Sequence, residues 1–335
     1  MIKLRALGLT LILLLVLAGV AIAGGSAEAD ADAEDEGITI GVALDNLNYP
    51  FWLGIKKGID DAAADLGVEL VVRTAEGDAV TQNNQIEDMI AQGIDGLVTV
   101  YVDRTSILQA VAAANDAGVP FVYCDRTLES TDDAKVAWGI ATDNYALTVN
   151  GWEWMAGYAR ENGMELKVLE LVGSLADENV LRRSDGFAEV MEANSDIIEL
   201  VQQVPTEWNL ERALAGTVNA LQANPEINTI FMHSDYLLGS TISALRQAGR
   251  WVPIGEEGHV AVMPYSGNAE SLQAMRDGYV EMTFGMDVYK TGYEAVRAAV
   301  ELAQGNEVGA PVSDPGFIIT QENFEEMAPR AYGSF

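Results

Sequence analysis

Cysteine and histidine are scarce in this chain of 335 residues, which has one Cys, Cys124, and two His, His233 and His259. A single Cys excludes an internal disulfide, so packing alone must hold the fold together. Cys124 ends an apolar run, which is typical of a buried thiol on a strand. The two histidines fall in no metal-ligand spacing, so we expect both to be incidental and the protein to need no metal or other cofactor.

Basic residues are also scarce, with 19 Lys and Arg against 51 Asp and Glu and a formal net charge of -32 at pH 7. A field of this sign repels the phosphates of nucleic acids and anionic membrane surfaces. It suits a secreted protein that is kept soluble by self-repulsion. We therefore expect no nucleic acid partner, and we expect a monomer.

The sequence motifs of common catalytic sites are missing. The sequence has no Gly-x-Ser-x-Gly elbow, no metal motif that contains His and no Gly-rich phosphate loop of the Walker type. Carboxylates are so frequent that a chance pair of them is no sign of acid–base catalysis. We therefore predict a protein that is not an enzyme.

One long apolar run is present at residues 7–22, and two basic residues precede it. The basic start, the short apolar stretch and the small residues at its end are typical of a signal peptide, which we expect to span residues 1–23 and to be cleaved near Ala23. A retained membrane anchor is the alternative, but the run is short for a span and no stop-transfer pattern follows. We predict export to the periplasm.

Residues 24–37 consist almost entirely of Gly, Ala, Asp and Glu. Such a segment cannot bury enough apolar surface to become ordered, so we expect a disordered acidic leader. Folded sequence begins at the apolar, β-branched run of residues 38–44. The remaining length is too great for one ordinary domain, and we expect two lobes.

From residue 38 onward the chain repeats one unit, in which an amphipathic helix, a glycine suited to a left-handed C-cap and a short apolar strand follow one another. This alternation predicts an α/β fold of two similar, doubly wound lobes with parallel sheets. The expected helices are residues 51–66, 84–91, 107–117, 150–161, 185–193, 210–223, 239–248 and 289–303, and the expected strands are residues 38–44, 68–72, 96–102, 119–124, 167–172, 197–201, 229–233, 259–263, 280–284 and 316–320.

Ligands of open parallel α/β sheets bind beyond the carboxyl ends of the strands, which directs attention to the loops that follow the expected strands. These loops contain residues of the kinds that bind small polar molecules. They are Asp45 to Trp52, Tyr101 to Asp103, Asp125–Arg126, Gly173 to Arg183, Ser234 to Tyr236 and Tyr265–Ser266.

The first of these loops combines a carboxylate, Asp45, with three aromatic side chains, Tyr49, Phe51 and Trp52. Aromatic faces stack on the C–H faces of a sugar ring, while Asp and Asn side chains bond its hydroxyls. The position at a strand end favours a ligand-binding role, and the alternative is that Phe51 and Trp52 pack in the core.

Asp125 and Arg126 directly follow an expected strand, so both charges stand at the carboxyl edge of a sheet. Arg offers a fixed fork of donors and Asp two acceptors, which together can hold adjacent hydroxyls. An ion pair that stabilises one lobe is the alternative. Further along the chain, Arg183 stands before an expected helix start, and Trp208 lies in a polar loop. Each could bind a ligand, but Arg183 could equally be a surface charge and Trp208 a core residue.

Taken together, these features resemble the type I periplasmic binding proteins of ABC sugar transporters, in the ribose-binding-like branch. The resemblance spans residues 38–320. It rests on the segment Asn48–Trp52 after the first strand, the segment Val119–Arg126, the triplet Thr142–Asn144, and Arg183 three residues before Gly186–Phe187.

This resemblance implies that two lobes close around a small polar ligand, with a sugar ring between Trp52 or Phe51 and Trp208, and that the closed form meets a membrane permease. It implies a hinge of three crossing strands near residues 142–143, 286–287 and 313–314. The N-terminal lobe would be residues 38–142 plus 287–313, and the C-terminal lobe residues 143–286 plus 314–335, with the ligand cleft between them.

The resemblance is incomplete at the second lobe, where ribose binders place an Asn, an Asp and a Gln and this chain has Ser234, Ser266 and Met286. A site that loses hydrogen-bond partners loses affinity, so we expect another monosaccharide or a polyol rather than ribose. The expected ligand contacts are Asp45, Tyr49, Phe51, Trp52, Tyr101, Asp125, Arg126, Arg183, Trp208, Ser234, Asp235, Ser266 and Met286.

Other functions are compatible with this kind of fold. The effector domain of a lac-repressor-type regulator would require a leading helix-turn-helix and a basic arm, which residues 1–37 lack. A periplasmic sensor that presents its ligand to a chemoreceptor, a binding protein for a non-sugar solute such as a nucleoside, and an enzyme built on this fold are the remaining alternatives.

Overall fold

The computed structural model describes residues 37–175 and 177–334. The predicted signal peptide and all but the last residue of the predicted acidic leader therefore lie outside the described residues. Within the part that the structure describes, no helix is long and apolar enough to cross a membrane.

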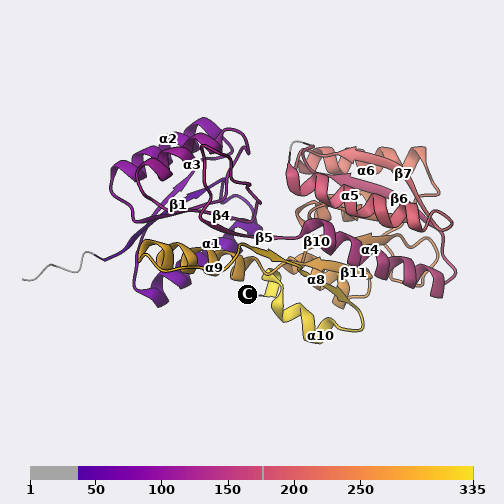
Figure 1. The fold of residues 1–335 in the computed structure, drawn as a ribbon. Coiled ribbons are helices and arrows are strands. Elements are labelled where there is room, and N and C mark those ends of the chain that lie inside the picture. The colour runs from indigo at the N-terminus through magenta and orange to yellow at the C-terminus, as the bar shows by residue number, and fades with distance from the viewer. Residues whose placement is uncertain (1–36, 176, 335) are drawn as a thin grey trace, which may run out of the picture. The chain divides into compact units, whose positions relative to one another are not determined.

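A six-stranded parallel sheet organises the first lobe, with its strands in the order β12-β5-β4-β3-β1-β2. Figure 1 shows β1 and β4 of this sheet between α2 and α3 on one side and α1 and α9 on the other. Alternate residues of β1 face opposite cores, since Val42 packs with α1 and α9 and Ala43 with α2 and α3. Both faces of the sheet are thus covered. The elements are β1 (Thr39–Leu44), α1 (Pro50–Leu66), β2 (Glu69–Thr74), α2 (Ala79–Ala91), β3 (Gly96–Thr99), α3 (Ile107–Asp116), β4 (Phe121–Cys124), β5 (Trp138–Thr142), α9 (Val288–Ala303) and β12 (Val312–Asp314).

The second lobe contains a four-stranded parallel sheet in the order β7-β6-β8-β9 and a small sheet in the order β10-β11-β13. In the small sheet β13 runs antiparallel to β11, so the expectation of purely parallel sheets holds for the two large sheets only. The elements are α4 (Asn144–Glu161), β6 (Leu166–Val172), α5 (Glu178–Ala193), β7 (Ile198–Pro205), α6 (Leu210–Ala223), β8 (Thr229–Met232), η1 (Asp235–Leu237), α7 (Leu238–Gln247), β9 (Ala261–Met263), β10 (Tyr265–Ser266), α8 (Ala269–Arg276), β11 (Met282–Gly285), β13 (Phe317–Thr320), α10 (Phe324–Met327), η2 (Ala328–Arg330) and η3 (Tyr332–Ser334).

The chain passes between the first and the second lobe at three places, after β5, after β11 and after β12, within one unit of the structure, Gly37–Phe335. Two of these crossings are joined, because the Asp143 N–H donates to the Asp314 carbonyl at 2.7 Å. The Asp143 side chain also caps α4 by accepting from the Ala146 N–H at 3.0 Å. The three crossings coincide with the expected hinge positions, but the lobe boundaries and the hinge itself stay predictions.

Helix starts differ from the sequence expectation at two helices that follow an Asp N-cap. Helix α4 begins at Asn144 rather than at residue 150, and α5 begins at Glu178 rather than at residue 185. The Asp177 side chain accepts from the Asn179 N–H at 2.9 Å, and the polar residues that follow it hide the helical period. The expectation that Arg183 precedes its helix was therefore wrong, because Arg183 lies inside α5.

Helices α1 and α9 approach closely because each carries a glycine at their contact. A Cβ on Gly58 would lie 2.0 Å from the Tyr289 carbonyl oxygen, and a Cβ on Gly292 would lie 2.1 Å from the Ile55 carbonyl oxygen. Both contacts involve backbone atoms, so no side chain can move to make room. The two glycines thus fasten α9, which comes from late in the chain, to the first lobe.

Replacing Gly58 with Ala should lower the free energy of unfolding by about 1–3 kcal/mol, because the added methyl forces two packed backbones apart. Urea denaturation measures the change. The matched control is Gly157→Ala in α4, where a Cβ meets no atom within 4 Å. That variant should instead gain about 0.5–1 kcal/mol from helix propensity. Equal stability of the two variants would contradict this account of the α1–α9 contact.

Candidate functional site

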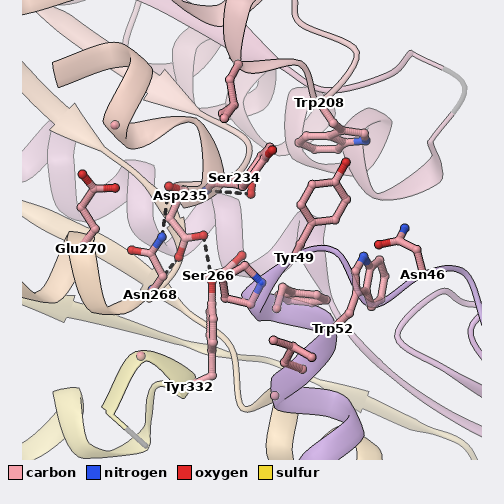
Figure 2. A pocket seen from close by; sticks show the side chains of 18 of the residues that line it. Asn46, Tyr49, Trp52, Trp208, Ser234, Asp235, Ser266, Asn268, Glu270 and Tyr332 are labelled. Atoms are coloured by element: carbon pink, nitrogen blue, oxygen red, sulfur yellow. Dashed lines mark hydrogen bonds between the residues drawn. The ribbon is translucent and has the colours of Figure 1, made fainter. Parts of the chain in front are cut away.

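A cavity of about 1050 Å³ lies at the carboxyl ends of strands from both large sheets and is lined by residues of both lobes. Figure 2 shows Tyr49, Trp52 and Trp208 gathered at one end of it and Asp235, Asn268 and Tyr332 at the other. Most of the residues expected from the sequence to contact a ligand line this cavity. They are Asp45, Tyr49, Phe51, Trp52, Asp125, Arg126, Arg183, Trp208, Ser234, Asp235 and Ser266.

Arg126 is held in the wall of the cavity by carboxylates and a carbonyl. Its Nη1 lies 3.0 Å from Asp45 Oδ2 and also donates to the Tyr101 carbonyl oxygen, and its Nη2 lies 4.0 Å from Asp177 Oδ2. Burial alone would lower the pKa of Arg126, but the surrounding carboxylates outweigh burial and the pKa lies above its ordinary value. The guanidinium also lies 5.4 Å from the centre of the Trp52 ring, so the cation and the aromatic surface face the cavity together.

Asp125 has an unusual backbone and an unpaired side chain. Its φ of 72° is in the left-handed region, which costs free energy for a residue with a Cβ and is common at functional sites. The residue is only 3% exposed, and no described residue forms a hydrogen bond or an ion pair with its carboxylate. Burial raises the pKa of Asp125 from 3.8 to about 6. The carboxylate is thus an acceptor without a partner in the cavity wall.

Arg183 is buried rather than exposed, which overturns the alternative that it is a surface charge. Its Nε donates to Asn144 Oδ1 at 2.8 Å, and its Nη1 donates to the His233 carbonyl oxygen. The guanidinium lies 4.0 Å from the centre of the Tyr265 ring. Contacts from three different elements therefore fix the orientation of this cation at the cavity.

A buried pair of ionisable groups, Glu170 and His233, lies behind Arg183. The two side chains meet at 3.0 Å, and Ser184 and Gln203 donate to the same carboxylate at 2.8 and 2.7 Å. Burial raises the pKa of Glu170, but the hydrogen bonds to His233 and the two donors outweigh it, so the pKa lies below its ordinary value. The expectation that His233 is incidental overlooked this structural role, because its partner is 63 residues away along the chain.

Asp235 links three distant segments at the other end of the cavity. Its Oδ2 accepts from the Asn268 N–H at 2.5 Å, and its Oδ1 accepts from the Tyr332 hydroxyl at 3.0 Å (Figure 2). The residue is 1% exposed, and burial raises its pKa from 3.8 to about 7. Sequence reasoning missed Asn268 and Tyr332, since neither follows an expected strand.

The aromatic residues of the two lobes approach each other across the cavity. The rings of Tyr49 and Tyr236 lie 4.5 Å apart at an interplanar angle of 68°, and Phe51 and Trp52 form a second edge-to-face pair at 5.0 Å. Trp208 has a φ of 56° and packs over Gly173, where a Cβ would lie 2.0 Å from the indole. Trp208 is therefore part of the cavity wall. The alternative that it is a core residue does not hold.

Two of the expected ligand contacts lie elsewhere in the structure. Tyr101 is buried in the first lobe and donates its hydroxyl to the Thr127 carbonyl oxygen at 2.8 Å. Met286 is 1% exposed and packs in a hydrophobic core. Neither lines the cavity in this structure, and their roles in ligand binding stay predictions. A position after a strand does not determine which side of the sheet a side chain faces.

Ser234 and Ser266 line the cavity with short side chains. The Ser234 hydroxyl already accepts from the Tyr236 N–H at 3.2 Å, and Ser266 has a φ of 108°. Neither side chain reaches as far into the cavity as an Asn or an Asp would, so this wall leaves additional room for a ligand. Within residues 37–175 and 177–334, no group of three or more His, Cys, Asp or Glu side chains could hold a metal ion.

Comparisons with known proteins show the family of the chain. Residues 40–307 match the periplasmic binding protein domain family. The ribose import binding protein of Bacillus subtilis is 29% identical over 285 residues, which cover 85% of this chain and 88% of that protein. The D-allose-binding periplasmic protein of Escherichia coli is 27% identical over 80% of this chain and 85% of its own.

Solved structures have the same fold. An ABC transporter solute binding protein of Bacillus halodurans with bound myo-inositol superimposes with a TM-score of 0.79 at 24% identity, over 89% of this chain and all of that one. One of Actinobacillus succinogenes with bound D-allose gives a TM-score of 0.78 at 22% identity, over 86% of this chain and 99% of that one. The sequence match over residues 40–307 and the shared fold show that the chain belongs to the periplasmic binding protein domain family.

Proposed function

We propose that this protein captures a monosaccharide or a polyol in the cavity between its lobes and delivers it to the permease of an ABC importer. The observation that carries the proposal is the composition of the cavity wall. Aromatic rings and fixed charged groups come from both lobes, with Trp52 and Arg126 from the first and Trp208 and Arg183 from the second. Stacking surfaces combined with directional hydrogen-bond groups are what a sugar ring requires.

Capture works by a shift between open and closed arrangements of the lobes. A ligand favours the closed arrangement only through contacts that improve on closure, so contacts must come from both lobes at once. The three crossings after β5, β11 and β12 are the places where the chain would bend. The closed form then offers one surface from each lobe to the permease.

The names of the relatives support a sugar or polyol as the ligand class. Curated relatives are named for ribose import and D-allose binding, and similar structures hold myo-inositol and D-allose. The short side chains of Ser234 and Ser266 favour a ligand other than ribose, such as another pentose, a hexose or a polyol.

Export is part of the same proposal. The family is one of periplasmic binding proteins, and residues 1–23 of the sequence have the pattern of a signal peptide. We propose that cleavage near Ala23 releases the mature protein into the periplasm. We propose that the protein acts by binding and not as an enzyme.

A thermal-shift screen of monosaccharides, polyols, nucleosides and amino acids tests the ligand class. A ligand that binds only the folded protein at one hundred times its Kd adds about 2.7 kcal/mol of stability. We expect at least one monosaccharide or polyol to raise the unfolding midpoint and to bind in calorimetry with one site. A response confined to nucleosides or amino acids would contradict the proposal, as would turnover of the bound sugar.

A further inference from the structure

The inner part of the cavity carries more negative than positive charge. Its ionisable residues are four aspartates and two arginines. Burial raises the pKa of Asp235 to about 7, so this carboxyl is only partly ionised near neutral pH and the excess lies between one and two negative charges. The remaining charged residues of the wall are Glu207, Glu270 and Lys57, which are exposed to solvent and therefore screened. The inner residues are Asp45, Asp125, Asp177, Asp235, Arg126 and Arg183.

The two arginines do not neutralise all four carboxylates. Arg126 lies 3.0 Å from Asp45 and at the longer distance of 4.0 Å from Asp177. Arg183 forms no ion pair with any described residue, and its hydrogen bonds go to Asn144 and to the His233 backbone carbonyl. One close ion pair is therefore present.

Asp125 is the carboxylate that is left most clearly unpaired. Asp125 is only 3% exposed and lines the cavity. No described residue donates a hydrogen bond to its carboxylate. Burial raises its pKa to about 6 although Arg126 and Arg183 attract the carboxylate, so the nearby cations offset only part of the cost of burying this anion. A ligand with a positive charge would remove that cost.

Closure of the lobes makes the imbalance more costly. Excluding water from the cavity strengthens every electrostatic interaction inside it, both the attraction of a cation and the repulsion among the carboxylates. A neutral sugar can donate hydroxyl hydrogen bonds to Asp125 but leaves the excess negative charge uncompensated. An ammonium group donates hydrogen bonds and supplies the missing charge together.

A bare metal ion does not fit this site. Within residues 37–175 and 177–334, no three His, Cys, Asp or Glu side chains converge closely enough to hold one. The carboxylates are instead distributed along walls that also carry the aromatic rings of Trp52 and Trp208. That arrangement suits an organic ligand whose ring stacks on an aromatic face while its substituents reach several carboxylates.

We propose that the ligand is an amino sugar or an amino-substituted polyol, whose ammonium group is bound by Asp125 and the neighbouring carboxylates of the inner cavity. This inference rests on the proposed capture of a sugar or polyol and narrows its class. The hydroxyls of such a ligand are left for Arg126 and Arg183, and its ring for the aromatic residues.

Matched pairs of compounds test the inference on the unaltered protein. Calorimetry at pH 7.5 would compare D-glucose with D-glucosamine, D-galactose with D-galactosamine, D-mannose with D-mannosamine, and myo-inositol with its amino-deoxy analogues, and N-acetylated forms serve as neutral controls. We expect an amine to bind at least about tenfold more tightly than its hydroxyl counterpart, and acetylation to remove the gain. The inference is wrong if, in every pair that binds, the hydroxyl compound binds as tightly as the amine or more tightly. The proposed function would then still stand. If no member of any pair binds while another monosaccharide or polyol of the thermal-shift screen does, this inference is wrong and the proposed function stands. If no monosaccharide or polyol of either set binds, the proposed function fails as well.

Asp125→Asn provides a second test, because Asn keeps the shape and tolerates the left-handed backbone but removes the charge. The variant should lose about tenfold or more in affinity for the amine and much less for the hydroxyl counterpart. Asp133→Asn, which removes an exposed carboxylate from a loop, is the control and should leave both affinities unchanged. An equal loss for amine and hydroxyl ligands in Asp125→Asn would overturn the assignment of the ammonium to Asp125.

Discussion

Arg126→Ala should weaken ligand binding by about 2–5 kcal/mol, roughly 30-fold to several-thousand-fold in Kd. Arg126 is the cation closest to the inner carboxylates, with Asp45 at 3.0 Å and Asp177 at 4.0 Å. Its removal leaves these carboxylates to repel one another and takes a fork of donors away from the ligand. The loss also frees the Trp52 ring from its contact with the guanidinium.

Calorimetric titration of the variant with the ligand found in the screen measures this effect. Arg297→Ala is the control, because Arg297 pairs with Glu294 on the exposed side of α9 and is not part of the cavity between the lobes. Arg126→Lys should bind with intermediate affinity, since it keeps the charge and loses the planar fork. Binding of Arg126→Ala at the wild-type level would show that the cleft is assigned wrongly.

The free energy of unfolding should fall as the pH rises from 5 to 8, and Asp235 should account for about 2–4 kcal/mol of the change. Burial raises the pKa of this carboxyl from 3.8 to about 7. Between these values the folded protein keeps a proton that the unfolded chain has lost. Stability therefore decreases with rising pH until the folded protein also loses the proton near pH 7.

Comparison with Asp235→Asn isolates this contribution, because the variant cannot titrate at this position. Urea denaturation at several pH values should show that the wild type becomes less stable relative to the variant as the pH rises. Other groups near Asp235 are Arg183, the Tyr332 hydroxyl and the backbone N–H groups of residues 267 and 268, and the substitution leaves all of them in place. A stability difference that does not change with pH would contradict the burial of a protonatable Asp235.

Much of the fold could be predicted because its signals are local. Gly67, expected to end the first helix, adopts a left-handed C-cap with a φ of 68°, and α6 spans the expected residues 210–223. The short strands β5 and β12 and helix α8 were not predicted as such, since their few residues carry no clear period. The starts of α4 and α5, which follow Asp caps, were also misplaced because their first residues show no clear helical period.

The cavity could be predicted only in part. Loops at the carboxyl ends of parallel strands contain most of its wall, because the topology of the sheet brings those ends together. Met286 and Tyr101 follow strands too, yet both are buried away from the cavity. The side of the sheet that each side chain faces depends on packing with elements far away in the sequence.

The sequence by itself determined the alternation of helices and strands, the glycine caps and the collection of polar and aromatic residues at the strand ends. These follow from the spacing of apolar residues and from the backbone freedom of glycine, which act within a few residues of each other. Only the tertiary structure decided how the charges are paired. It joined Asp235 to Tyr332 and Arg183 to Asn144, and it left Asp125 without a partner among the described residues. The reason is physical, since the partner and the burial of a charge depend on segments that only folding brings together.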